Sequence, residues 1–206
     1  MVNITSLTKA EITIISFFIG NIKKEFGIRE ISRNIKTDYK NTYSTIQKLA
    51  KKGVLLKRRK ANIDLCSLNL KGDSGEICFV EAMKARNFME KHRVIKDFFN
   101  AVMDKTRHIY YSLIIFGSFA KGKETKSSDL DILVIAPEKS IADEIERIIN
   151  TEAVTVSAGI HSIAISESDF IANLADKKPN VITEAFKSHI IITGSEPFYQ
   201  GVKKAL

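Results

Sequence analysis

The sequence predicts an α+β fold in two parts, and three observations lead to this prediction. Apolar residues recur at helical spacing in the first fifty residues, and two strand-like apolar runs follow them. After a small, polar stretch at 71–75, helical patterns alternate with apolar runs of strand length. The two parts also differ in net charge. The excess positive charge lies in the first part, because residues 1–70 hold 14 Lys and Arg against 5 Asp and Glu. We therefore expect a domain at 1–70, a linker and connecting helix at 71–90, and a second domain at 91–206.

The composition is that of an ordinary globular protein, with 44% hydrophobic and 27% charged residues. No run of eighteen apolar residues occurs, and the N-terminus lacks the pattern of a signal peptide. Two cysteines, Cys66 and Cys78, lack the spacing of a metal site and are expected to be reduced thiols. We therefore expect a cytoplasmic protein without a membrane partner.

The first part begins with three predicted helices. Thr8 and Glu11 have the spacing of a capping box, and apolar residues follow them at helical intervals. A short second helix is expected at about 28–35. The third is expected from about Asp38 to Gly53, because glycine commonly follows the last turn of a helix.

A basic hairpin is predicted next, with strands at 54–57 and 63–68 and a turn at 58–62. Three helices followed by such a hairpin resemble a winged helix-turn-helix domain, a resemblance that implies a third helix in the DNA major groove and a hairpin wing. The expected DNA-facing residues are Lys40, Asn41, Ser44 and Lys48 on the helix and Arg58, Arg59 and Lys60 on the wing. The net charge of +9 over residues 1–70 favours nucleic acid as the partner. Winged-helix folds also serve in protein interaction and dimerisation, so that alternative and a homodimer stay open.

The second part is predicted to mix helices and short strands. A helix from Ile77 to about His108, with a break near 91–92, carries Phe98 and Phe99, which we assign to the core rather than to base stacking. Residues 151–158 are compatible with either a strand or a continued helix. The remaining elements, in chain order, are strands at 113–116 and 132–135, a helix marked by Ile141, Ile145, Ile148 and Ile149, a strand at 160–165, helices at 166–175 and 181–188, a strand at 190–193 and a helix at 196–205.

The stretch 113–135, LIIFGSFAKGKETKSSDLDILVI, is the most informative part of the chain. Asp129 and Asp131 stand at the start of its second strand, and residues two apart on a strand point to the same face. Adjacent carboxylates repel each other unless a cation neutralises them, and a hard divalent cation such as Mg²⁺ suits this role. The alternative is a pair of solvated aspartates at a strand end.

Gly117 and Ser118 end the first strand of this stretch. They offer backbone N–H groups and a hydroxyl where a helix is expected to begin at Phe119, and a helix N-terminus binds phosphate well. Ser118 could equally act as a helix cap. Together with the aspartates, this arrangement indicates a site for a metal-bound nucleoside triphosphate.

The Gly-Ser pair, the ten-residue spacer and the Asp-x-Asp sequence resemble the signature of the minimal nucleotidyltransferases, a branch of the DNA polymerase β superfamily. Ala120, Lys121, Gly122 and Ser128 match the pattern further, and the resemblance covers about residues 90–200. It implies that Asp129 and Asp131 are catalytic metal ligands for one or two Mg²⁺ ions. It also implies that Gly117 and Ser118 hold the distal phosphates of an NTP, with ATP the default. Lys121 is either a phosphate contact or a solvated side chain.

One feature departs from the family pattern, in which a later strand usually supplies a third acidic residue. The corresponding stretch, His161 to Ile165, contains neither Asp nor Glu. Glu167 lies just beyond it and is explained by the first turn of a helix, while His161 is either a substitute base or structural.

Two functions therefore stay open. One is a nucleotidyltransferase that modifies a protein hydroxyl, a small molecule or an RNA end, with a DNA-binding winged helix. The other is a DNA-binding regulator that senses nucleotide without turning it over.

Overall fold

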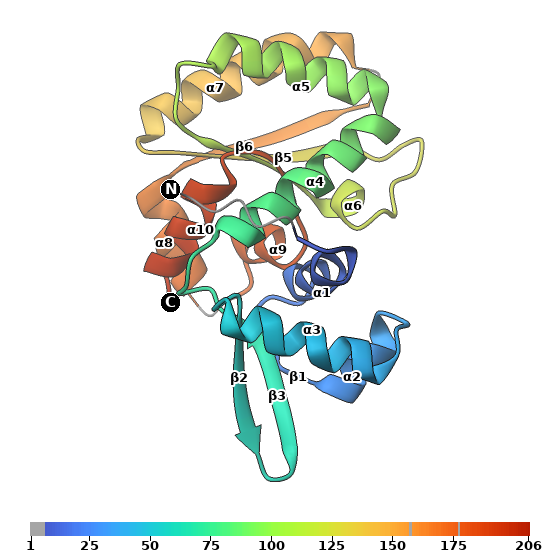
Figure 1. Ribbon diagram of the computed structural model, residues 1–206. Helices are drawn as coiled ribbons and strands as arrows, with labels where there is room; N and C mark the ends of the chain where they lie inside the picture. The colour runs from blue at the N-terminus through green and yellow to red at the C-terminus, as the bar shows by residue number, and fades with distance from the viewer. Residues whose placement is uncertain (1–6, 157, 177) are drawn as a thin grey trace. The chain divides into compact units, whose positions relative to one another are not determined.

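The computed structural model describes residues 7–156, 158–176 and 178–206, and within these ranges it shows helices and two small sheets (Figure 1). The α+β prediction is therefore confirmed. The chain forms two compact units, an N-terminal unit of Met1–Val80 and a C-terminal unit of Glu81–Leu206. Each unit is described separately below.

In the N-terminal unit, helices pack on a three-stranded antiparallel sheet with strand order β1-β3-β2. The capping box predicted at Thr8 and Glu11 is present, so the start of the first helix is confirmed. In chain order the elements are α1 (Lys9–Ile19), β1 (Phe26–Gly27), α2 (Ile28–Asn34), α3 (Tyr39–Lys51), β2 (Leu55–Lys60) and β3 (Ile63–Leu68).

Helix α3 is amphipathic, and this decides which of its side chains reach solvent. Its N-terminus is capped by the Asp38 carboxylate, which accepts a hydrogen bond of 2.8 Å from the Asn41 backbone N–H. Thr42, Thr45, Ile46 and Leu49 form its buried stripe. The opposite face is left exposed, and it carries Tyr39, Lys40, Asn41, Tyr43, Ser44 and Lys48.

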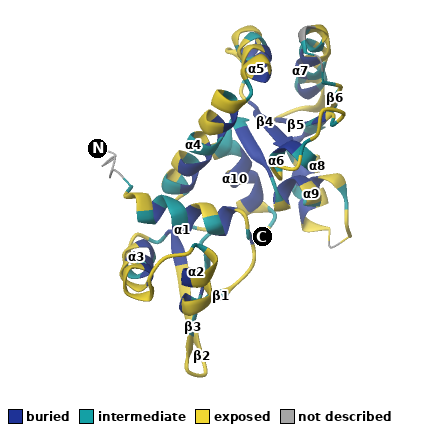
Figure 2. Ribbon diagram, turned by 90° about the vertical axis from the view of Figure 1, so that its right-hand side faces the viewer, coloured by how far each residue is buried: buried dark blue, intermediate teal, exposed yellow. Residues whose placement is uncertain are grey.

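The hairpin differs from its prediction, because the expected turn at 58–62 is shorter. Strand β2 continues to Lys60, which is paired with Ile63, and only Ala61 and Asn62 connect the strands. Ala61 has a φ of 51°, in the left-handed region that short turns use. The outer part of this ribbon is largely exposed, as Figure 2 shows in yellow. Its pairing rests on backbone hydrogen bonds rather than on an apolar pattern, so charged side chains do not end the strand.

The C-terminal unit is built on a four-stranded sheet with strand order β6-β5-β4-β7. Strands β4–β5 and β4–β7 are antiparallel, and β5–β6 are parallel. The elements, in chain order, are α4 (Gly75–Lys91, which begins in the N-terminal unit), α5 (Arg93–Thr106), β4 (Ser112–Phe116), α6 (Gly117–Ala120), β5 (Leu130–Ala136), α7 (Lys139–Glu152), a 3₁₀ turn (Ala153–Thr155), β6 (Ile160–Ser166), α8 (Glu167–Ala175), α9 (Val181–Lys187), β7 (Ile190–Thr193) and α10 (Ser195–Lys204).

Helices cover both faces of this sheet, with α5 and α7 on one face and α8, α9 and α10 on the other (Figures 1 and 2). Strands β4 and β5 are therefore buried on both faces, which explains their continuous apolar runs. Phe98 and Phe99 belong to the core under α5, as predicted. On the other face, Phe198 packs against Phe170, with 5.4 Å between the ring centroids.

The helical segments of this unit agree closely with the predictions. The break expected near 91–92 occurs at His92, between α4 and α5. The ambiguous stretch at 151–158 continues the helix to Glu152 and then forms the 3₁₀ turn, while Ser157 lies outside the described residues. The predicted start of helix α6 was wrong, because the helix begins at Gly117 rather than at Phe119. It is only four residues long. Gly117 has a φ of 70°, which lets the chain turn directly out of β4.

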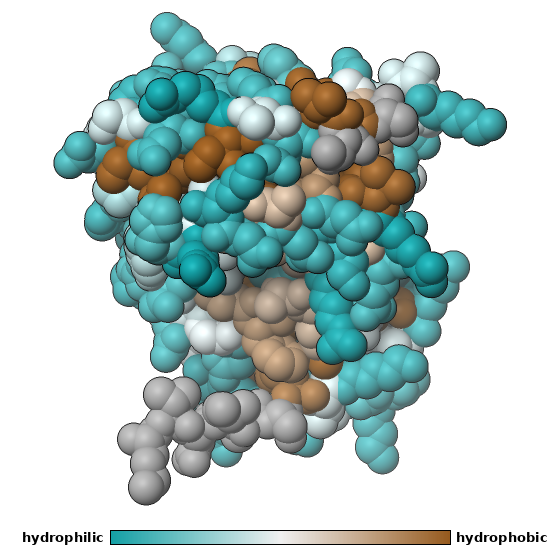
Figure 3. Space-filling view, turned by 90° about the horizontal axis from the view of Figure 1, so that it is seen from above, coloured by the Kyte–Doolittle hydropathy of each residue, from teal (hydrophilic) through white to brown (hydrophobic). Residues whose placement is uncertain are grey.

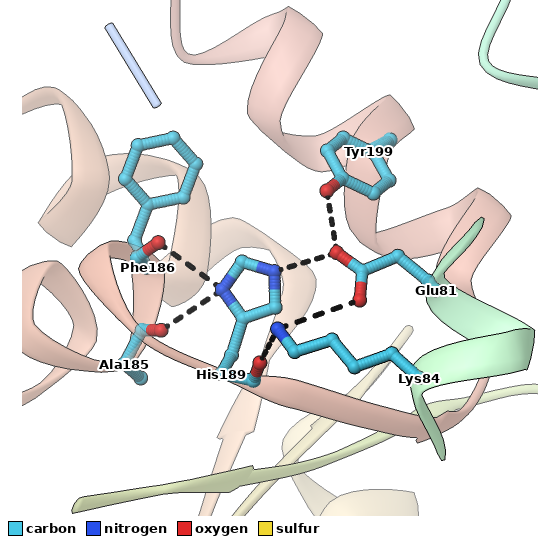
Figure 4. A network of polar contacts seen from close by, with 6 residues as sticks. All are labelled: Glu81, Lys84, Ala185, Phe186, His189 and Tyr199. Atoms are coloured by element: carbon cyan, nitrogen blue, oxygen red, sulfur yellow. Dashed lines mark hydrogen bonds and ion pairs between the residues drawn. The ribbon is translucent and has the colours of Figure 1, made fainter. Parts of the chain in front are cut away.

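A buried polar network connects α4 to residues near the C-terminus (Figure 4). The Glu81 carboxylate is fully buried, and its Oε1 accepts hydrogen bonds from His189 Nε2 at 2.9 Å and from the Tyr199 hydroxyl at 2.8 Å. The Lys84 ammonium donates to the His189 carbonyl oxygen. The network joins α4, the residue before β7, and α10.

The surface over α5 and α7 is mostly hydrophilic, with hydrophobic side chains in small groups between polar ones (Figure 3). Within the described ranges, no helix is long and apolar enough to span a membrane.

Candidate functional site

The two aspartates lie where β5 begins. Leu130 is fully buried, and it anchors the strand between Asp129, which is exposed, and Asp131, whose side chain is 28% exposed. Strand register places Phe116 of β4 beside Asp131 on one side and His161 of β6 on the other. The end of β4 and the starts of β5 and β6 therefore meet at one edge of the sheet.

Two glycines make room for these carboxylates. A Cβ at Gly117 would lie 2.0 Å from Oδ2 of Asp131, and a Cβ at Gly159 would lie 2.1 Å from Oδ1 of Asp129. The Gly159 carbonyl also accepts a hydrogen bond of 2.8 Å from the Leu130 N–H. Gly159 was not among the site residues predicted from the sequence. Its position directly before the predicted strand at 160–165 was the only feature of the sequence that indicated a special role for it.

Among the described residues, neither Asp129 nor Asp131 forms an ion pair with a Lys or an Arg. Within the described part of the chain, the charged-group contact of the pair joins Asp131 Oδ1 to His161 Nδ1 at 3.4 Å. Two carboxylates at one strand end, with no Lys or Arg partner among the described residues, suit a hard divalent cation, so the donor set and the glycine cradles fit such an ion. As the side chains stand, no group of three His, Cys, Asp or Glu within the described ranges is close enough to enclose a metal.

The remaining residues of the predicted phosphate site lie on the same sheet edge. Gly117 and Ser118 form the start of α6, directly after β4. The Ser118 carbonyl accepts hydrogen bonds from the backbone N–H groups of Lys121, at 3.2 Å, and Lys123, at 3.0 Å. Lys121 is exposed. After the larger effect of the Lys187 hydrogen bond, its charge helps to hold the pKa of Glu184 on α9 below its usual value.

The loop between α6 and Asp129 is held at two points that the sequence did not indicate. Glu124 Oε1 lies 3.6 Å from His92 Nε2, and the His92 ring packs on Phe88 with 4.4 Å between centroids. Further along, Ser128 Oγ accepts a hydrogen bond of 2.9 Å from the Thr125 N–H. These contacts order the chain just before Asp129.

The N-terminal unit contains the predicted DNA-facing residues. Lys40, Asn41, Ser44 and Lys48 are all exposed on α3. The three wing residues differ from one another, because Arg58 Nε donates to Glu25 Oε1 at 2.6 Å, whereas Arg59 and Lys60 are exposed without a carboxylate at ion-pair distance among the described residues. Arg58 therefore has part of its charge neutralised within the unit.

A groove of about 630 Å³ lies beside the β2–β3 hairpin, and its lining includes Arg29, Arg33, Tyr39 and Arg59. The Arg29 guanidinium lies 5.9 Å from the centroid of the Tyr39 ring. Arg29 and Arg33 were not predicted from the sequence, because the groove forms only when α2, the start of α3 and the β2–β3 hairpin come together.

Comparison with known proteins gives a family match for part of the C-terminal unit. Residues 101–197 match the family model described as polymerase beta, nucleotidyltransferase. This range contains Gly117, Ser118, Asp129 and Asp131. The predicted polymerase β-type nucleotidyltransferase domain is therefore confirmed for these residues.

The chain also resembles one curated protein over a short segment. A protein of Methanocaldococcus jannaschii, provisionally named a protein adenylyltransferase, is 43% identical over 47 residues, which is 23% of this chain and 47% of the relative. The match thus spans about half the length of that relative. No solved structure matches the chain.

Proposed function

We propose that this protein is a nucleotidyltransferase that moves a nucleoside monophosphate from an NTP, with ATP the default, to a hydroxyl of a protein acceptor. The observation that carries the proposal is the pair Asp129 and Asp131. They stand at one sheet edge with Gly117 and Ser118 and have no Lys or Arg partner among the described residues. The name of the M. jannaschii relative supports a protein as the acceptor.

The reaction is an in-line displacement at the α-phosphorus. The acceptor oxygen forms a bond to phosphorus, the bond to the β-phosphate oxygen breaks, pyrophosphate leaves, and the hydroxyl proton passes to solvent. A divalent cation, Mg²⁺ by the family resemblance, would supply charge neutralisation on the triphosphate. Asp129 and Asp131 would hold this cation, and the backbone N–H groups at Gly117 and Ser118 would contact the distal phosphates, with Lys121 as a further phosphate contact.

The test is incubation of the purified chain with α-labelled ATP, CTP, GTP or UTP and Mg²⁺. We expect pyrophosphate release and transfer of label, both lost in the double variant Asp129→Asn/Asp131→Asn. Asp104→Asn, at an exposed position on α5, is the matched control and should leave both unchanged. Pyrophosphate release that persists in the double variant would contradict the site.

Calorimetry makes this test independent of the acceptor. The wild-type chain should bind Mg·ATP, and the double variant should not. Unchanged affinity in the double variant would refute the assignment even if no acceptor is present in the assay.

We also propose that the N-terminal unit binds DNA through α3 and the wing. The order of its elements, the exposed basic residues of α3 and the groove beside the wing support this proposal. Loss of DNA binding on raising the salt concentration is expected, because phosphate contacts release counterions. Binding that does not depend on salt would argue against it.

A second candidate function, a DNA-binding regulator that senses nucleotide, is favoured by one observation. Strand β6 carries no Asp or Glu beside Asp131. In that case the chain would bind Mg·ATP without releasing pyrophosphate, and nucleotide would change its affinity for DNA. Turnover above the level of the Asp129→Asn/Asp131→Asn variant would exclude this candidate.

A further inference from the structure

We propose that His161 is the third protein ligand of the metal site, so that the site binds a first-row transition ion such as Mn²⁺ in preference to Mg²⁺. The proposal rests on the metal site assigned above to Asp129 and Asp131. It adds a nitrogen ligand from the neighbouring strand and changes which ion the site selects.

Strand register brings His161 to this position. Strands β5 and β6 are parallel, with Asp131 directly beside His161. Side chains at paired positions of neighbouring strands point to the same face of a sheet, and the strands lie about 4.8 Å apart. His161 and Asp131 therefore stand next to each other at the sheet edge where Asp129 also lies.

The distance between the two side chains is that of two ligands on one ion. Asp131 Oδ1 and His161 Nδ1 are 3.4 Å apart. Two donor atoms that each lie about 2.1 Å from a metal, at angles between octahedral and tetrahedral, are about 3.0–3.4 Å apart. A hydrogen bond between nitrogen and oxygen would be shorter, about 2.7–3.2 Å. An ion can therefore contact both atoms with little movement of either side chain.

The remaining ligand, Asp129, has to turn from its present position, since the three side chains do not enclose a metal as they stand. Asp129 now lies against Gly159, and it is exposed. The His161 side chain is 64% exposed, so neither residue must leave a packed core to turn toward an ion. By contrast, His189 is buried against Glu81, and the His92 ring packs on Phe88.

The ligand types determine the preferred ion. Carboxylates and water suit both Mg²⁺ and Mn²⁺, whereas imidazole suits transition metals such as Fe²⁺ and Zn²⁺. Mn²⁺ belongs to the same transition series and has the oxygen preference of Mg²⁺. Two carboxylates and one imidazole form a mixed set of oxygen and nitrogen ligands, which Mn²⁺ accepts. The nitrogen ligand adds little to the affinity for Mg²⁺. Since β6 offers no carboxylate beside Asp131, His161 is the donor that this strand supplies.

The test uses Mn²⁺ alone, with electron paramagnetic resonance of the full chain. Binding is measured by loss of the signal of free Mn²⁺, and nitrogen ligation by electron spin-echo modulation from a directly bound nitrogen. We expect this modulation in the wild-type chain and its loss in His161→Gln, with Mn²⁺ affinity lowered by about tenfold or more. His161→Asp should restore metal affinity and shift the preference toward Mg²⁺.

His108→Gln is the matched control, because His108 is exposed and no carboxylate lies at ion-pair distance from it among the described residues. It should leave Mn²⁺ affinity and the nitrogen modulation unchanged. Far-UV circular dichroism establishes that each variant is folded.

The outcomes separate this inference from the proposed function. If Asp129→Asn/Asp131→Asn abolishes Mn²⁺ binding while His161→Gln changes neither affinity nor modulation, the metal site stands and the role of His161 is refuted. If the aspartate variant binds Mn²⁺ as the wild type does, the metal site itself is wrong.

Discussion

The carboxylate of Asp131 lies against the α-carbon of Gly117, so a Cβ at Gly117 would lie 2.0 Å from Asp131 Oδ2. Gly117 also has a φ of 70°, which side chains other than glycine rarely adopt. The residue is therefore required twice, once for the turn out of β4 and once for the position of the carboxylate.

Gly117→Ala should weaken Mg·ATP binding by more than tenfold, because the new methyl group displaces the Asp131 carboxylate. The left-handed backbone adds a stability cost of about 1–2 kcal/mol. Calorimetry and thermal unfolding measure the two effects separately.

Gly122→Ala is the control for strain alone. Gly122 has a φ of 60°, and nothing lies within 4 Å of a Cβ placed there. This variant should lose similar stability and keep its nucleotide affinity. Equal loss of affinity in both variants would show that strain, not displacement of Asp131, is the cause.

Gly159→Ala should lower metal affinity with little change in stability, because a methyl group there limits the room in which the Asp129 side chain turns toward an ion. Its Cβ would meet Asp129 Oδ1 at 2.1 Å, and that atom is the end of an exposed, flexible side chain. A double-mutant cycle with Asp129→Ala measures whether the two residues act together. In the Asp129→Ala background, Gly159→Ala should have no further effect on metal affinity, and an additive loss would contradict the assignment.

Glu81→Gln should destabilise the chain by about 1–3 kcal/mol at pH 7, because it removes a buried charge from the network of Figure 4. Burial by itself raises the pKa of Glu81, but His189, Lys84 and Tyr199 together hold it below the ordinary value of 4.5. A lowered pKa means that the ionised carboxylate stabilises the folded state above pH 4.5, and this contribution is lost as the pH falls through the folded-state pKa. The difference between wild type and variant should therefore shrink in acid.

Urea denaturation at pH 7 and below pH 4, followed by far-UV circular dichroism, checks this expectation. Glu90→Gln, on the same helix, is the matched control, because Glu90 is exposed and pairs with the exposed Arg86. Its effect should be small at either pH. A Glu81→Gln difference that is constant with pH would rule out ionisation as its source.

Arg59→Ala should weaken DNA binding more than Arg58→Ala. Arg59 lines the groove beside the wing, whereas Arg58 is bound to Glu25. If Arg59 contacts one phosphate, its removal should reduce the slope of log affinity against log salt by about one. Fluorescence anisotropy with a labelled duplex at several salt concentrations measures this slope. Equal effects of the two substitutions would place the contact outside the groove.

The local features of this chain could be predicted from the sequence because short-range physics determines them. The capping box at Thr8, the break at His92 and the apolar runs of β4 and β5 all follow from periodicity, propensity and capping. The two-residue spacing of Asp129 and Asp131 likewise predicts that their side chains point to one face of a strand.

Only the tertiary structure decided which distant residues complete these features. Gly159 beside Asp129, His161 beside Asp131 and Arg29 in the groove of the wing depend on strand register and helix packing. Glu81 meets His189 and Tyr199 across separations of 108 and 118 residues. Local patterns specify where a strand or helix forms, but not its neighbour or its register. Those depend on how the whole chain buries its apolar surface and satisfies its buried polar groups.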